Sequence, residues 1–119
     1  MIGVDIELLS RFEGKVDDKF LNKVCDEREI EYIMQKGNKE QTLAGIYCAK
    51  EAISKVFKCG IFNELSLKDI VILHEKNGAP YLLENEKIIA LLKKFELKKI
   101  HVSISHDNSS AIAVALGEK

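Results

Sequence analysis

The residues best suited to chemistry at the start of this chain are two carboxylates. In the stretch MIGVDIELLSRF, Asp5 and Glu7 are two residues apart in a segment that alternates like a β-strand. Both therefore project from one face, and Val4 and Ile6 project from the other. Two acids on one strand face are typical of a solvated edge strand, but paired oxygens also bind hard cations such as Mg²⁺. The local sequence leaves both interpretations open.

A second group lies in AKEAISK, inside the longest predicted helix. Glu51 and Lys55 are four residues apart, so they share a helix face, and Lys50 is adjacent to Glu51. One interpretation is a surface ion pair, which stabilises a helix by about 0.3–0.5 kcal/mol. The other is that Glu51 binds a metal ion while Lys50 and Lys55 contact phosphate oxygens as compact point charges.

A third group lies in HVSISHDNSS, near the end of the chain. His106 ends a predicted strand and enters a polar turn, and alternation places Ser105 on the face opposite Ile104. His106 is either a turn histidine with a local hydrogen bond or a ligand contact. His101 and His74 are isolated histidines on predicted strands, and we expect both to be structural or surface residues.

Length and composition indicate one globular domain over residues 1–119. The chain has 18 basic and 19 acidic side chains and a net charge of −1, which gives no electrostatic case for binding nucleic acid or membrane. No apolar run approaches the roughly 20 residues of a membrane-spanning helix, and no signal segment opens the chain, so a cytoplasmic protein is expected. Cys25, Cys48 and Cys59 have no C-x-x-C spacing and are expected to be small buried hydrophobes.

Periodicity and capping signals predict an α+β domain in the order β-α-α-α-β-β-α-β-β, with a largely antiparallel sheet. Gly45 lies inside the longest helix, where it costs about 1 kcal/mol against alanine, so a close packing contact is expected there. The predicted elements are a strand at 2–7, an irregular or helical segment at 8–23, a helix at 26–37 capped by Asp26, a helix from Asn38 to Gly60, a hairpin at 66–83 turning at Asn77-Gly78, a helix at 85–97, and two strands at 98–117.

Taken together and in this order, GVDIELLSRF, AKEAISK and HVSISHD resemble the phosphopantetheinyl transferases. The length of the chain and its ending VSISHDNSSAIAVAL are similar to the holo-acyl-carrier-protein synthase branch, and the resemblance extends from Ile2 to about Leu116. It implies a 4′-phosphopantetheinyl transferase-like fold, in which an antiparallel sheet packs against a long helix and shorter helices.

The resemblance implies a reaction that transfers the 4′-phosphopantetheine arm of coenzyme A to a serine of an apo-acyl carrier protein. The second product is adenosine 3′,5′-bisphosphate. By motif match, Asp5 and Glu51 would hold Mg²⁺, with Glu7 as a further ligand. Lys50 and Lys55 would contact the phosphates, with Glu51 and Lys55 as the catalytic residues. Glu51, or a water held by the metal, would take the serine proton.

The resemblance also implies where the nucleotide binds and how the chain assembles. His106 and Ser105 are expected at the 3′-phosphate, and the turn with Asn77, Gly78 and Pro80 on the adenosine side. Members of this length form homotrimers with coenzyme A between neighbouring subunits. The resemblance implies that the carrier protein is the one used in fatty acid synthesis.

The chain departs from the family pattern in its longest helix. The family usually has an arginine four residues before the lysine of K-E-A, and this chain has Ile46 there. The next position, usually phenylalanine, is Tyr47. Lys58 is the candidate replacement for the lost positive charge. The missing arginine favours the alternative of a non-catalytic module that binds coenzyme A or a nucleotide. The resemblance implies an acidic carrier protein as partner. If residues 8–23 form one helix, a stripe of basic side chains would bind this carrier, namely Arg11, Lys15, Lys19 and Lys23.

Overall fold

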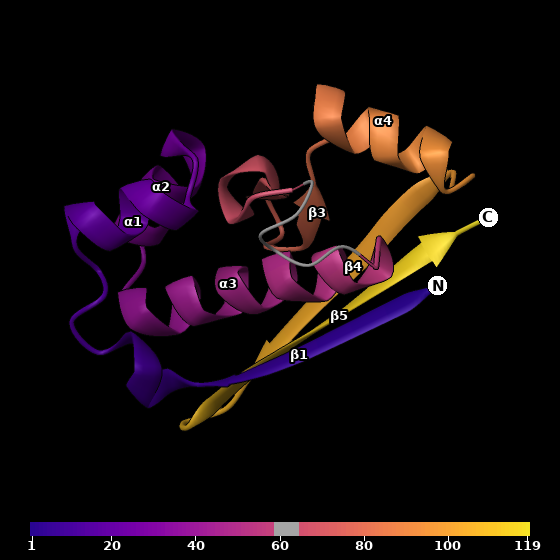
Figure 1. Ribbon diagram of the computed structural model, residues 1–119. Helices are drawn as coiled ribbons and strands as arrows, with labels where there is room; N and C mark the ends of the chain where they lie inside the picture. The colour runs from indigo at the N-terminus through magenta and orange to yellow at the C-terminus, as the bar shows by residue number, and fades with distance from the viewer. Residues whose placement is uncertain (59–64) are drawn as a thin grey trace.

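The computed structural model describes residues 1–58 and 65–119, and its elements follow the predicted order. The chain is an α+β protein in which an antiparallel sheet packs against one long helix (Figure 1). In chain order the elements are β1 (Ile2–Leu8), the 3₁₀ turn η1 (Leu9–Phe12), α1 (Asp18–Val24), α2 (Glu27–Met34), α3 (Lys39–Val56), the 3₁₀ turn η2 (Leu67–Asp69), β2 (Ile72–His74), β3 (Pro80–Leu82), α4 (Glu86–Lys94), β4 (Lys99–His106) and β5 (Ser110–Glu118).

Side-chain caps fix where the helices begin. Asp26 caps α2, and Glu29 accepts a hydrogen bond from the Asp26 N–H at 2.9 Å, which completes a capping box. Asn38 caps α3, as predicted. The predicted end of that helix is wrong, because α3 ends at Val56. Gly60, which was expected to end it, lies outside the described residues.

The long helix α3 crosses one face of a three-stranded sheet. The strands are antiparallel in the order β1-β5-β4, and β2 and β3 form a separate hairpin (Figure 1). Beneath α3, β5 presents only small side chains, so the helix can approach the sheet closely; these are Ala111, Ala113 and Ala115. A Cβ atom on Gly45 would lie 3.0 Å from Cγ2 of Ile104, which confirms the close contact predicted at Gly45.

Strand β1 lies against α3 at a glycine. A Cβ atom on Gly3 would lie 2.0 Å from the carbonyl oxygen of Ala52 and 3.1 Å from Cβ of Lys55, so no side chain fits there. Asp5 and Glu7 share this face of β1 by alternation. They face α3 and are mostly buried, so the interpretation of a solvated strand face is wrong.

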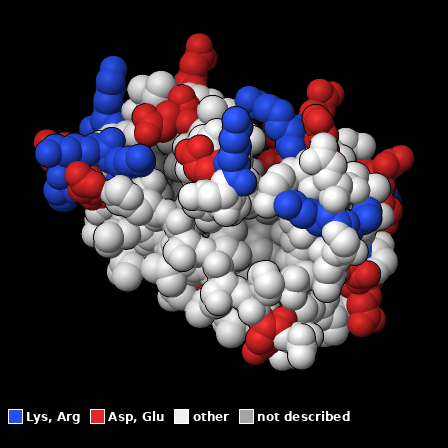
Figure 2. All heavy atoms as spheres, turned by 180° about the vertical axis from the view of Figure 1, so that it is seen from behind, with Lys and Arg blue, Asp and Glu red and all other residues white. Residues whose placement is uncertain are grey.

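The opposite face of the sheet is apolar and exposed. It carries Ile2, Val4, Ile6, Leu8, Ile112, Val114 and Leu116, which are between 37% and 69% exposed. In Figure 2 the lower half of the molecule, at the height of the three strands, shows few charged side chains, whereas the upper half shows many. A contiguous apolar face of this kind is typical of a contact surface.

A buried ion pair joins α2 to α3. The Lys50 ammonium donates to Glu29 Oε1 at 2.7 Å, and neither side chain has exposed surface. Lys50 also donates to the carbonyl oxygens of Leu67 at 2.9 Å and Ile70 at 2.6 Å. Glu29 Oε2 accepts the N–H of Ile72 at 2.8 Å. The pair therefore anchors the chain between η2 and β2 to both helices.

Residues 8–23 do not form the continuous helix that a basic stripe requires. Arg11 lies on η1, Lys15 lies in the following loop, and Lys19 and Lys23 lie on α1. Lys15 packs over the ring of Phe20, 5.5 Å from its centroid. The stripe is therefore divided among three segments, and the prediction of one stripe is wrong.

Cys25 and Cys48 are free and buried, as predicted, and Cys59 lies outside the described residues. Across residues 1–58 and 65–119, no helix combines the length and the apolar character needed to cross a membrane.

Replacing Lys50 by Met should lower the free energy of unfolding by about 3–5 kcal/mol, because it leaves Glu29 as an unpaired buried carboxylate. The matched control is Lys87→Met, which breaks the exposed pair between Lys87 and Asp69 at 3.0 Å. That change should cost less than about 1 kcal/mol. Urea unfolding measures both, and equally small losses would contradict a structural role for Lys50.

Candidate active site

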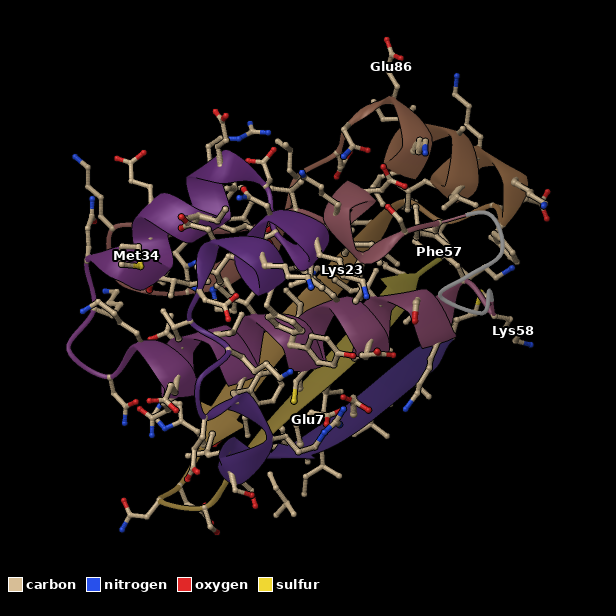
Figure 3. The ribbon with its side chains drawn as sticks, turned by 60° about the vertical axis from the view of Figure 1, so that its left-hand side comes forward. Glu7, Lys23, Met34, Phe57, Lys58 and Glu86 are labelled. Carbon is tan, nitrogen blue, oxygen red and sulfur yellow. The ribbon has the colours of Figure 1, made fainter. Side chains whose placement is uncertain are left out.

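Three carboxylates gather where β1 meets α3. The side chains of Asp5 and Glu7 are 14% and 9% exposed, and both face the helix. Glu51, on α3, lies close enough for its charge to act on Glu7. Figure 3 shows Glu7 between β1 and α3. The structure therefore brings together the three residues predicted to bind a metal ion.

Two cations partly neutralise this carboxylate cluster of Asp5, Glu7 and Glu51. Lys55 Nζ donates to the carbonyl oxygen of Val4 at 2.8 Å and to Asp5 Oδ1 at 3.3 Å. Arg11 forms an ion pair with Glu7. Asp5 Oδ2 is buried and has no hydrogen-bond partner among the described residues. A buried carboxylate oxygen without a partner is costly, so this atom is available to a ligand.

The electrostatics show that negative charge is crowded in the cluster. The pKa of Glu7 is raised from 4.5 to about 7, first by burial and then by the neighbouring carboxylates of Asp5 and Glu51. Arg11 opposes this shift. Burial and the same Glu51 carboxylate raise the pKa of Tyr47, one turn earlier on α3. The cluster therefore holds a proton where a cation would relieve the same repulsion.

The donor set fits a hard divalent cation, which prefers carboxylate oxygens. Within residues 1–58 and 65–119, no three His, Cys, Asp or Glu side chains are already arranged around one point as metal ligands. Lys55 and Arg11 instead supply the positive charge that such an ion would bring. The Asp5 Oδ2 atom, which has no partner among the described residues, and the raised pKa of Glu7 are both compatible with a ligand of positive charge at this cluster.

A cavity of about 170 Å³ lies between α2, α3, the β2–β3 hairpin and β4. Three predicted site residues line it, namely Gly78, Pro80 and His106. The other lining residues are Tyr32, Gln41, Thr42, Gly45, Ile46, His74 and Ile104.

Two predicted contacts do not line this cavity. Asn77 Oδ1 accepts the N–H of Ala79 at 3.0 Å, so the Asn77 side chain shapes the turn. Ser105 lies on the exposed face of β4, opposite Ile104, which does line the cavity. Within one chain, Ser105 therefore points away from the cavity and the expected contact is not made.

The cavity and the carboxylate cluster lie on opposite sides of α3. Nine residues separate Thr42, at the cavity, from Glu51, at the cluster, which is about two and a half turns of helix. The strands agree, because Asp5 lies on β1 and His106 lies on β4, the two outer strands on either side of β5. Within one chain the cavity and the carboxylate cluster are therefore separated by α3.

Residues 1–115 match the family described as the 4′-phosphopantetheinyl transferase superfamily. The chain belongs to this superfamily. Its relatives include the holo-[acyl-carrier-protein] synthase of Fusobacterium nucleatum, which is 41% identical over 117 residues that cover 97% of this chain and 95% of the relative. The synthase of Halothermothrix orenii is 39% identical over 121 residues, covering 99% and 96%.

Solved structures of such synthases share the fold of this transferase. The Helicobacter pylori synthase in complex with coenzyme A has a TM-score of 0.85 and 34% identity, covering 99% of this chain and 100% of that one. The Neisseria meningitidis synthase has a TM-score of 0.88 and 26% identity, covering 99% and 97%. The chain is therefore an enzyme of the phosphopantetheinyl transferase class, with the α+β fold that its motifs imply.

The two lysines of AKEAISK play different parts in this transferase. All three hydrogen bonds of the Lys50 ammonium are made inside the core, so the prediction that Lys50 contacts phosphate is wrong. Lys55 is 51% exposed at the cluster and can turn to an incoming anion. Lys58 lies beyond the end of α3 at Val56, and it does not line the cavity to which Ile46 belongs.

Two cavity residues of the transferase were missed by the sequence reasoning. Tyr32 attracted no interpretation, and His74 was expected to be a structural or surface residue, yet both line the cavity. They come from α2 and β2, 42 positions apart in sequence, so no local spacing signals their contact.

Glu7 should make the stability of the protein depend on pH. Its folded-state pKa of about 7 lies above its ordinary value of 4.5, so between these values the folded protein holds a proton that the unfolded chain has released. The free energy of unfolding should therefore fall as pH rises from about 5 to 7. Urea unfolding at several pH values should show a shallower fall in Glu7→Gln, while the exposed control Glu13→Gln keeps the wild-type slope. Identical slopes in all three proteins would contradict the raised pKa.

Proposed function

We propose that this transferase moves 4′-phosphopantetheine from coenzyme A to a serine hydroxyl of an apo-acyl carrier protein, with Mg²⁺ as cofactor and adenosine 3′,5′-bisphosphate as the second product. One observation carries the proposal: Asp5 Oδ2 is buried beside Glu7 and Glu51 and has no hydrogen-bond partner in the part of the chain that the structure describes. The relatives named holo-[acyl-carrier-protein] synthase, one of them seen with coenzyme A, support it. The carrier is that of fatty acid synthesis, in the cytoplasm.

The carboxylate cluster and Lys55 carry the chemistry in this proposal. Asp5 and Glu51 would hold the Mg²⁺, with Glu7 as the third ligand, and the ion would supply positive charge to neutralise the pyrophosphate. The serine oxygen forms a bond to the phosphorus that bears the pantetheine. The bond from that phosphorus to the bridging oxygen breaks, and adenosine 3′,5′-bisphosphate leaves with the electron pair. Glu51, directly or through a water, takes the serine proton, and Lys55 places positive charge on the phosphate oxygens.

The cavity receives the nucleotide end of coenzyme A. Gly78 and Pro80 form the turn against which the adenosine lies, and His106 reaches the 3′-phosphate from the end of β4. Ile46 brings no charge to this cavity, so the phosphate contact that an arginine makes in relatives is absent. This substitution favours the second candidate, a module that binds coenzyme A without transferring the arm. The carboxylate cluster has no use in such a module, so we place the transferase first.

We propose that the active site is completed between copies of the chain in a homotrimer. The cavity and the cluster lie on opposite sides of α3. A single coenzyme A molecule would have to wrap around the helix to contact both in one copy. The exposed apolar face of β1 and β5 provides the contact surface between copies. A cavity from one copy then meets the cluster of its neighbour.

The transfer itself is tested by weighing the carrier. Wild-type protein incubated with Mg²⁺, coenzyme A and an apo-acyl carrier protein should add the mass of one phosphopantetheine arm. Asp5→Asn and Glu51→Gln should each slow this transfer about 100-fold or more, because a metal ion supplies several kcal/mol of transition-state stabilisation. Glu86→Gln is the control and should keep full activity, because Glu86 lies on α4, at the top of Figure 3 and away from Glu7.

The mass assay also separates the two candidate functions. Binding of coenzyme A without any mass gain on the carrier would support the non-catalytic module and overturn the transferase. Full activity in Asp5→Asn or Glu51→Gln would overturn the metal assignment while leaving the transfer in place.

Light scattering tests the assembly. Three chains of 13.4 kDa give a mass of about 40 kDa for the wild type. Ile6→Lys places a charge in the exposed apolar face and should give a folded monomer with little transfer activity. A wild-type mass of one chain at assay concentration would contradict a site shared between copies.

A further inference from the structure

Two rings form a parallel stack at the wall of the cavity. Tyr32 from α2 and His74 from β2 have ring centroids 3.9 Å apart and planes within 5° of parallel. The ammonium of Lys36, which follows the end of α2, lies 4.5 Å from the Tyr32 centroid. Since His74 covers one face of the tyrosine ring, Lys36 occupies the other. The face of the stack that these contacts leave uncovered is therefore the outer face of the His74 imidazole.

The histidine of this stack is held beside the nucleotide turn. His74 ends β2 and pairs across the hairpin with Pro80, so both residues border the cavity from neighbouring backbone. The turn is closed by a hydrogen bond from the Gly78 N–H to the Glu75 carbonyl oxygen at 2.9 Å. Among the described residues, His74 Nδ1 has no hydrogen-bond partner. Packing against Tyr32, rather than a hydrogen bond, therefore fixes the plane of the imidazole.

The imidazole is an uncharged ring at neutral pH. Burial, and then the positive charge of Lys36, lower the pKa of His74 below its ordinary value of 6.5. The groups that border the stack on its far side are Arg28 and Glu31 of α2 and Tyr81 of β3, which line a second cavity. A neutral heteroaromatic ring favours stacking on a nucleobase over pairing with a phosphate.

The facing walls of the cavity suit the same kind of ligand. Ile46 and Ile104 are apolar, and Gly45, which has no side chain, lines the cavity beside them and packs closely against Ile104. The cavity of about 170 Å³ is smaller than the roughly 300–1,000 Å³ of a site for a whole drug-sized ligand. It therefore suits one planar ring system.

From this geometry we propose that the Tyr32–His74 stack is the specificity-determining element for the base of coenzyme A, with His74 stacking on the adenine ring. The inference rests on the proposed function and assigns these two residues a role within it. Ile46 brings no charge to this part of the cavity, which suits an uncharged base.

Calorimetry with the two halves of coenzyme A tests the stack. His74→Ala should weaken binding of adenosine 3′,5′-bisphosphate about tenfold or more and leave binding of 4′-phosphopantetheine unchanged, because only the first half carries a base. It should raise KM for coenzyme A by the same factor at constant kcat. His74→Phe keeps a flat ring and should restore both values. Tyr81→Leu removes an aromatic ring that lines only the second cavity and should have no effect.

The outcomes separate this inference from the proposed function. Wild-type affinity for the bisphosphate in His74→Ala, in a protein that still transfers the arm, would overturn the role of His74 alone. Equal losses for both halves of coenzyme A, or no rescue by His74→Phe, would show a structural role and also overturn it. A wild-type protein that binds neither half would overturn both proposals.

Discussion

The carbonyl oxygen of Ala52, on α3, lies so close to Gly3 of β1 that no side chain can be accommodated at this glycine. The 2.0 Å between the Ala52 oxygen and a Cβ atom on Gly3 means that helix and strand touch through backbone. This contact brings Asp5 and Glu7 under α3, beside Glu51 and Lys55. It also lays α3 flat on the alanines of β5, so the helix divides the inner face of the sheet. The carboxylate cluster and the nucleotide cavity follow from this one packing constraint, and so does their separation.

Two lysines five residues apart on α3 show how strongly packing decides function. Lys50 and Lys55 have the same chemistry, but Lys50 points to α2 and satisfies its ammonium within the core. Lys55 points to β1 and keeps half of its side chain in solvent. A buried lysine with three acceptors, one of them a carboxylate, stabilises one arrangement of the chain. Only the exposed lysine is free to meet a substrate.

Local signals allowed much of this fold to be predicted. Caps at Asp26 and Asn38, the Asn77-Gly78 turn and strand alternation act over a few residues, so they can be read directly. Alternation also showed that Asp5 and Glu7 share a face, but not that this face is the inner one. That depends on Gly3 and α3, which are distant in sequence. The motif resemblance then supplied the assignment of these carboxylates as metal ligands, which remains a prediction and which spacing alone left open.

The errors in the predicted site share a physical cause. The helical period places Lys50 beside Glu51, but it does not show which of the two side chains points into the core. Strand alternation groups residues on one face, but it does not show which face of the sheet is buried. Alternation placed Ser105 correctly on the face opposite Ile104, but it did not show that the cavity lies on the side of Ile104. Tyr32 and His74 meet only because α2 and the hairpin fold onto the same end of α3. Contacts between distant segments of this kind carry no signature in a single sequence.

The central claim is that the cavity of one copy acts with the carboxylate cluster of another, and complementation tests it most directly. Asp5→Ala and His106→Ala should each be nearly inactive alone, one lacking the cluster and the other a cavity contact. After the two variants are unfolded, mixed equally and refolded, about a quarter of the sites should pair an intact cavity with an intact cluster and recover activity. Mixed trimers, confirmed by mass, that recover no activity would show that each chain holds a complete site and would contradict the account.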